Sequence, residues 1–118
     1  MSNSIRPQRI QRKRVKGFDL QAVSLALNGL PAMSVTRGGR YGNPFKIGDT
    51  VIFGHEEPKS VKVTKDNCLF LFEERLRWEL KQNPAYLDAL RGHNLACWCP
   101  LSSPCHVDIY LKILAETE

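Results

Sequence analysis

The chain has 118 residues, a length typical of one domain, and its 42% hydrophobic and 25% charged residues are ordinary for a soluble protein that forms a core. No apolar run approaches the ~18 residues that cross a bilayer, which argues against a membrane protein. The basic amino terminus lacks the apolar stretch of a signal peptide, so we expect a single cytoplasmic domain spanning residues 1–118. In that compartment, four cysteines indicate thiols, metal ligands or buried residues rather than disulfides.

The net charge is +5, and much of the excess lies near the amino terminus. The basic residues there are Arg6, Arg9, Arg12, Lys13, Arg14 and Lys16. They could contact the phosphates of nucleic acid, or they could be the solvated charges of an edge strand. We favour the edge strand, because a basic composition alone is weak evidence for nucleic-acid binding. A phosphorylated small molecule would also suit a basic face.

The first half of the chain predicts a strand, a helix, a second strand and a loop. These elements lie within residues 9–15, 18–30, 31–35 and 36–45. Asp19 is a suitable N-cap for the helix, and Asn28-Gly29 supplies its end. The loop contains three glycines, one proline and two arginines in ten residues, which is typical of a turn-rich connection.

The second half predicts a hairpin or irregular segment and three helices around one strand. The segment covers residues 46–60, the helices lie within 63–82, 84–90 and 104–116, and the strand covers 94–99. Thr64 or Asp66 can cap the long helix, and Ser103 can cap the last one, with Pro104 at its first position.

Strands and helices therefore alternate along the chain. This order predicts an α/β fold with a small, mostly parallel sheet flanked by helices, as a Rossmann-like three-layer sandwich. In such folds, ligands bind at the carboxyl ends of the strands. The loop at residues 36–45 and the segment at residues 97–106 both follow strands. We therefore expect them to line the same crevice.

The loop carries side chains that could bind a nucleotide. Its glycine amides can form an anion-binding concavity, and Arg37 and Arg40 could hold a phosphate. Tyr41 and Phe45 could stack on a base. The expected ligand-binding residues are Arg37, Gly38, Arg40, Tyr41, Gly42, Asn43, Pro44 and Phe45. The alternative is a connector whose glycines and proline serve only its geometry, since neither a dinucleotide fingerprint nor a Walker loop is present.

The segment at residues 97–106 holds three of the four cysteines. Cys97 and Cys99 lie two residues apart on a predicted strand, where burial is the usual role of a free cysteine. Cys105 and His106 lie at the start of the last helix, where the helix dipole would lower the pKa of a thiol. If the protein is an enzyme, we expect Cys105 as nucleophile or as a neighbour of the oxyanion site, and His106 as acid–base group. Asp108 is the residue expected to orient His106, although a partner from another segment is equally possible.

A zinc site is the alternative for the same segment. Cys97, Cys99, Cys105 and His106 are suitable ligands, but their spacing is unusual and adjacent residues on a helix diverge by about 100°. We therefore predict no metal and no cofactor, and keep a zinc-stabilised structural domain as an alternative.

Taken together, the sequence resembles the domain-of-unknown-function family 4326. The resemblance rests on "VTRGGRYGNPF", "LRGHNLACWCPLSSPCHVD" and the basic "RPQRIQRKRVKGF" at the start. The matching positions are Arg37, Tyr41, Gly42, Asn43, Pro44, Phe45, Cys97, Cys99, Cys105, His106 and Asp108. Phages and bacteria often encode such proteins, and the family name implies no particular activity. The resemblance also implies that the basic start belongs to the domain rather than to an added tail.

The expected function is binding of a nucleotide or a related phosphorylated metabolite between the loop and the Cys105-His106 helix start. As an enzyme, the protein would be a nucleotide hydrolase or a glycosyl or base transferase. The alternative is a non-enzymatic, phage-type accessory module that binds nucleic acid or a host protein. The sequence gives no prediction for the oligomeric state.

Overall fold

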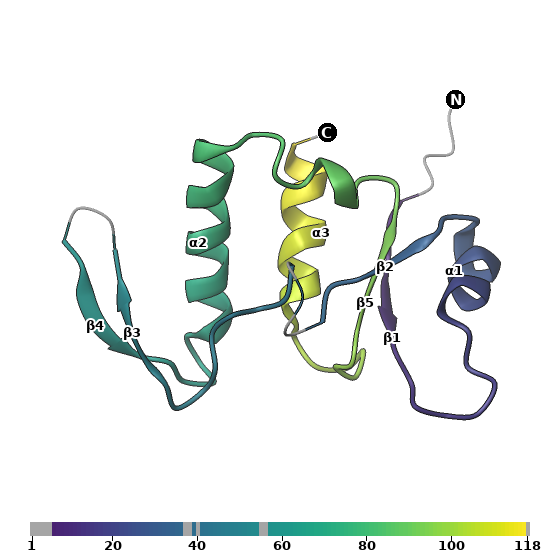
Figure 1. The fold of residues 1–118 in the computed structure, drawn as a ribbon, viewed down its shortest axis with the longest axis horizontal. Helices are drawn as coiled ribbons and strands as arrows, with labels where there is room; N and C mark the ends of the chain where they lie inside the picture. Colours follow the sequence, from purple (N-terminus) through teal and green to yellow (C-terminus); the bar gives the residue numbers. More distant parts are fainter. Residues whose placement is uncertain (1–5, 37–38, 40, 55–56, 118) are drawn as a thin grey trace.

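In the computed structural model, which describes residues 6–36, 39, 41–54 and 57–117, the chain forms a mixed α/β domain (Figure 1). The strands are β1 (Arg9–Gln11), β2 (Ala32–Ser34), β3 (Thr50–Phe53), β4 (Lys59–Lys62) and β5 (Asn94–Cys97). The α-helices are α1 (Leu20–Asn28), α2 (Cys68–Gln82) and α3 (His106–Glu116), and η1 (Asp88–Leu90) is a single 3-10 turn. The predicted alternation of strands and helices is confirmed for the described residues.

The central sheet has β5 in its middle, between β1 and β2, and all three strands run parallel. All four residues of β5 are buried, because helices cover both faces of the strand. Leu95 and Cys97 point into the larger core with α2 and α3, whereas Ala96 packs with Ile10 and Ala32 on the opposite face. Figure 1 shows α1 on one side of this sheet and α3 on the other.

Helix α1 forms as the sequence predicts. The Asp19 carboxylate accepts a hydrogen bond from the amide of Ala22, and Gly29 ends the helix with φ +80°, a conformation that favours glycine. Its apolar residues do not form a buried face. Ser24 is its one buried residue, and Val23 and Leu27 are exposed by 41% and 47%. The helix is held instead by polar contacts, such as the 2.7 Å hydrogen bond from Asn94 Nδ2 to Ser24 Oγ.

The larger core lies between β5, α3 and α2. Phe72, Leu76 and Tyr110 are buried there, and the Phe72 and Tyr110 rings meet edge to face at 5.2 Å. β3 and β4 form a separate antiparallel hairpin, which lies beyond α2 in Figure 1. The hairpin predicted around β3 is therefore present.

Two helix boundaries differ from the predictions. The helix expected within residues 84–90 is reduced to η1, because the preceding residues form turns. α3 begins at His106 with Cys105 as its N-cap, two residues later than Ser103 would place it. The cause is that Asp108 reaches back to the amide of Cys105 and fixes the helix start there. Among the helices that the structure describes, none is long and apolar enough to cross a membrane.

Candidate functional site

Three cysteine sulfurs meet where β5 ends and α3 begins. Cys97 closes β5, Cys99 lies in the following turn, and Cys105 caps α3. Their Sγ atoms all lie within 4.8 Å of one another, and those of Cys97 and Cys105 are 3.1 Å apart. All three thiols are free. Cys68, the remaining cysteine, is buried in α2.

The hydrogen bond between Cys97 and Cys105 separates the pKa values of the two thiols. The interaction with Cys105 lowers the pKa of Cys97 to about 6, against the effect of burial. The pKa of Cys105 rises instead, because its proton is held by Cys97 and its sulfur is buried. This direction favours Cys97, rather than the predicted Cys105, as the thiolate of the pair. Cys105 is also only 2% exposed, which does not suit a nucleophile that must reach a substrate.

Asp108 positions the backbone rather than the histidine. Its Oδ2 accepts the amide of Cys105 at 3.0 Å and the guanidinium of Arg9 at 2.9 Å. The same guanidinium donates to the carbonyl groups of Cys99 and Pro100. The prediction that Asp108 orients His106 is wrong, because its carboxylate points to the N-cap and to β1.

His106 is fixed by other partners. Its Nε2 contacts the carbonyl oxygen of Val35, which can only accept, so Nε2 carries the proton and donates. Its Nδ1 lies 3.4 Å from the Sγ of Cys105. The ring packs edge to face against Phe72 and Tyr110, and the residue is 6% exposed. His106 therefore joins the end of β2 to the start of α3.

A pocket of about 500 Å³ opens beside the cysteines, at the carboxyl ends of β2 and β5. Volumes of this size are typical of small-molecule sites. Its lining residues are Thr36, Asn43, Ile47, Lys65, Cys68, Leu69, Cys97, Trp98, Cys99, Ser102, Ser103, Pro104, Cys105 and His106. The loop after β2 and the segment after β5 therefore contribute to one pocket.

The predicted ligand loop divides among several environments. Asn43 lines the 500 Å³ pocket, but its side-chain amide is engaged by other protein groups. Its Oδ1 accepts a hydrogen bond from the backbone amide of Phe45 at 2.9 Å, and its Nδ2 donates one to the Sγ of Cys68 at 3.4 Å. Tyr41 and Phe45 are buried at 5% and 7% exposure. The base stacking predicted for these two rings is wrong, because both belong to the core. Arg37, Gly38 and Arg40 lie outside the described residues.

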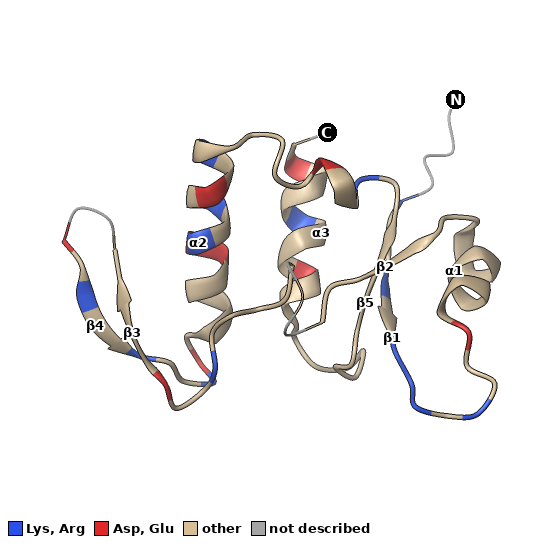
Figure 2. Ribbon diagram, in the orientation of Figure 1, with Lys and Arg blue, Asp and Glu red and all other residues tan. Residues whose placement is uncertain are grey.

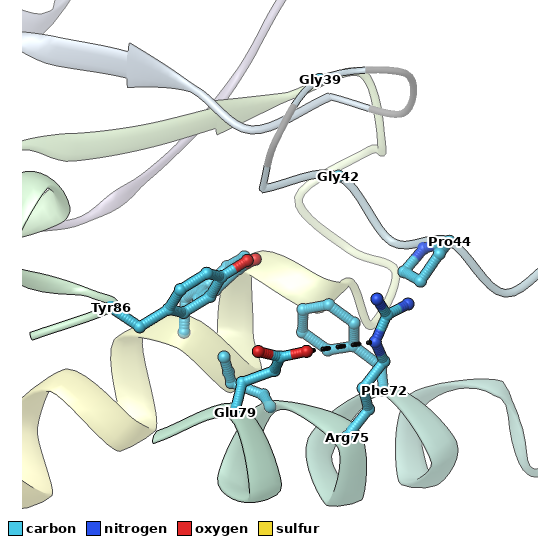
Figure 3. Close-up of a pocket in the computed structure, with 9 residues that line it drawn as sticks. Gly39, Gly42, Pro44, Phe72, Arg75, Glu79 and Tyr86 are labelled. Carbon is cyan, nitrogen blue, oxygen red and sulfur yellow. Dashed lines mark ion pairs between the residues drawn. The ribbon is translucent and has the colours of Figure 1, made fainter. Parts of the chain in front are cut away.

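Gly42 and Pro44 line a smaller pocket over α2, with Arg75, Glu79 and Tyr86 (Figure 3). Its volume is about 140 Å³, below the range of ordinary ligand sites. Arg75 and Glu79, one turn apart on α2, form an ion pair at 4.0 Å on one side of it, drawn as a dashed line in Figure 3. The smaller pocket is therefore a weaker candidate than the one beside the cysteines.

Trp98 and Lys65 also line the pocket, although the sequence predicted no binding role for either. Trp98 is 37% exposed, and the guanidinium carbons of Arg12 and Arg14 lie 4.5 and 4.4 Å from its ring centroid. The alternation of β5 is the signal that could have found it, because a residue between the inward Cys97 and Cys99 must face away from the core. Lys65 lies in the turn before α2, and nothing in the linear sequence places it near Trp98.

This geometry defines the class of the protein. It is a small α/β domain with a cysteine-lined pocket at the carboxyl edge of a parallel sheet. The chain belongs to the domain of unknown function family DUF4326, whose model matches residues 23–116. This match confirms the family resemblance seen in the sequence. It begins inside α1, so the basic start and β1 lie outside the matched region. No curated protein and no solved structure shows significant similarity to the chain.

Proposed function

We propose that this protein binds a nucleotide or a related phosphorylated metabolite in the pocket beside the cysteines. The observation that carries the proposal is the convergence of Thr36, Trp98 and Ser103 on one volume of about 500 Å³. These residues come from the ends of β2 and β5 and from the turn before α3. Ligands in open parallel sheets bind at this edge.

Trp98 supplies the surface for a base. Among the described residues that line the pocket, Trp98 is the one whose aromatic ring is partly exposed. Stacking of a base on such a ring contributes about 1 to 3 kcal/mol of binding free energy. The guanidinium groups of Arg12 and Arg14 lie over this ring, so a base stacks there by displacing one of them. Together with Lys65 on the pocket wall, these arginines supply positive charge for a phosphate. Ser102 and Ser103 add hydroxyl groups at the same wall.

The layer arrangement supports the same proposal. Helices α1 and α3 lie on opposite sides of the parallel sheet, as they do in Rossmann-like sandwiches (Figure 1). We include in the proposal that the domain is a reduced sandwich of this kind and that it works in the cytoplasm, where its four thiols stay reduced. The proposal is for binding, because Cys105 is too deeply buried for the nucleophilic role.

Calorimetric titration of the full chain tests the proposal, with adenine and guanine mono- and triphosphates and inorganic phosphate as probes. We expect saturable binding of at least one nucleotide, and Trp98→Ala should weaken it by about tenfold. Trp78→Ala is the matched control, because Trp78 lies on α2 at 36% exposure and outside this pocket. The proposal fails if no probe binds at millimolar concentration, or if the two variants bind alike.

Nucleic acid is the second candidate ligand, and one observation favours it. Lys13, Arg14 and Lys16 are exposed in the loop after β1, which Figure 2 shows as a basic stretch. Binding through phosphates would weaken steeply with salt. Titration of a fluorescent single-stranded oligonucleotide at two salt concentrations tests this candidate, and binding that does not respond to salt excludes it.

A further inference from the structure

We propose that Cys97, Cys99 and Cys105 bind one thiophilic divalent metal ion of the zinc class, with the fourth coordination position open to the pocket. This inference is independent of the proposed nucleotide binding. In the sequence, the unusual spacing of these cysteines argues against a metal site. In the fold, their sulfurs nevertheless lie close together, because the end of β5, the next turn and the start of α3 are adjacent.

The distances between the sulfurs fit a single ion. All three Sγ atoms lie within 4.8 Å of one another, and the closest two are 3.1 Å apart. Tetrahedral zinc holds each sulfur at about 2.3 Å, which places neighbouring sulfurs about 3.8 Å apart. The distances between the sulfurs are therefore within about 1 Å of the spacing that one ion requires.

The backbone around the sulfurs is held in place by one buried cation. The side chain of Arg9 is 8% exposed, and it contacts the carbonyl of Cys99 and the carboxylate of Asp108. Asp108 in turn holds the amide of Cys105. Groups of this kind orient metal ligands in known sites.

Arg9 also matches the charge of the site. Three thiolates and a divalent ion carry one net negative charge, which must be balanced in a partly buried place. The Arg9 guanidinium lies close enough to Cys97 and Cys105 to interact electrostatically with both sulfurs. Arg9 belongs to β1, the strand that pairs with β5. Arg9 therefore places a positive charge beside the loaded site while it keeps its ion pair with Asp108.

The pocket gives the ion an open side. All three cysteines belong to the lining of the 500 Å³ pocket, and Cys99 is the most exposed of them. Sites with three protein ligands leave the fourth position to water or to a bound ligand. The site is therefore one that a pocket ligand can reach.

Metal analysis and cobalt titration of the purified full chain test the inference. We expect one zinc per chain by mass spectrometry after purification without chelator. The reduced apoprotein should take up one Co²⁺ and develop thiolate-to-metal charge-transfer absorption. Cys99→Ser should reduce affinity by about tenfold or more, and it should fold because Cys99 is the least buried of the three.

Cys68→Ser is the matched control, because Cys68 is the cysteine outside the cluster and a hydroxyl can keep its contacts with Asn43 and Phe45. It should bind cobalt as the parent chain does. Circular dichroism confirms that each variant is folded before titration. The inference is overturned if the folded, reduced parent chain binds neither ion, or if Cys99→Ser binds cobalt with unchanged affinity and spectrum.

Discussion

Arg9 and Asp108, 99 positions apart in the chain, form an ion pair at 2.9 Å that joins β1 to the first turn of α3. The same carboxylate oxygen accepts the amide of Cys105, so one acidic group fixes both an edge strand and a helix start. The turn after β5 is tied to the pair as well, through the carbonyl of Pro100. The geometry of the pocket wall therefore depends on this pair.

Asp108→Ala should lower the free energy of unfolding by about 1 to 2 kcal/mol, because it removes a helix-capping acceptor and leaves the Arg9 charge without its carboxylate. Urea denaturation followed by circular dichroism measures the change. Asp88→Ala is the control, since Asp88 pairs with Arg91 at the surface with 61% of its side chain exposed. An exposed pair contributes about 0.5 kcal/mol or less. Equal losses in the two variants would contradict the role given to Asp108.

Asn94→Ala should cost about 2 to 3 kcal/mol, because Asn94 is fully buried and its amide joins three elements. Its Nδ2 donates to Ser24 in α1, and its Oδ1 accepts the amide of Gln8 before β1. Removing it leaves these groups buried without partners. Thermal unfolding measures the effect, with Asn83→Ala as a control at an exposed helix end. A loss no greater than that of the control would contradict this account.

Removal of residues 1–17 should abolish cooperative unfolding, although the family match begins only at residue 23. β1 supplies the Gln8 carbonyl for the amide of Leu95 at 3.0 Å, and Arg12 donates to Cys97 at 2.7 Å. Ile10 also fills the core under α1. Without them, β5 becomes an edge strand with unpaired backbone groups. A truncated chain with an unchanged melting transition would show that β1 is dispensable.

Glu73 links α2 to α3 and should make stability depend on pH. Its carboxylate accepts hydrogen bonds from Lys112 Nζ at 2.8 Å and from Arg77 Nε at 2.9 Å. These contacts hold the pKa of Glu73 below the ordinary 4.5. A lowered pKa in the folded state adds stability above the unfolded pKa, and this stability is lost as the pH falls through the folded value. Glu73→Gln should therefore cost about 0.5 kcal/mol at neutral pH and nothing well below pH 4.5.

Denaturation curves at several pH values give this profile. Glu74→Gln is the control, since its carboxylate lies exposed on the same helix. A cost for Glu73→Gln that persists in acid would mean that the loss comes from packing rather than charge.

The sequence predicted the elements well where local signals are strong. Asp19 and Gly29 mark the ends of α1, and the patterns of α2 and α3 follow helical spacing. Which residues of a helix are buried was harder to predict. Val23 and Leu27 are apolar yet exposed, because α1 is anchored through the buried Asn94 rather than through an apolar stripe.

The site was predictable in its location and not in its chemistry. The two loops reach one pocket, as parallel strands require, and Asn43 and His106 both line it. The roles of the individual site residues depend on contacts between residues that are far apart in the sequence. Asp108 turns toward Arg9, His106 toward Val35, and Cys105 forms a hydrogen bond with Cys97, and no local spacing encodes these pairings.

Mapping the ligand by amide and indole NMR shifts tests the proposed function most directly. The isotope-labelled full chain would be titrated with ATP and with AMP, and the indole signals of Trp98 and Trp78 followed separately. We predict saturable shifts of the Trp98 indole and of the amides of Thr36, Cys99 and Ser103, which surround the 500 Å³ pocket. Shifts confined to Glu79 and Tyr86 at the smaller pocket, or no saturable shift with either nucleotide, would contradict the account.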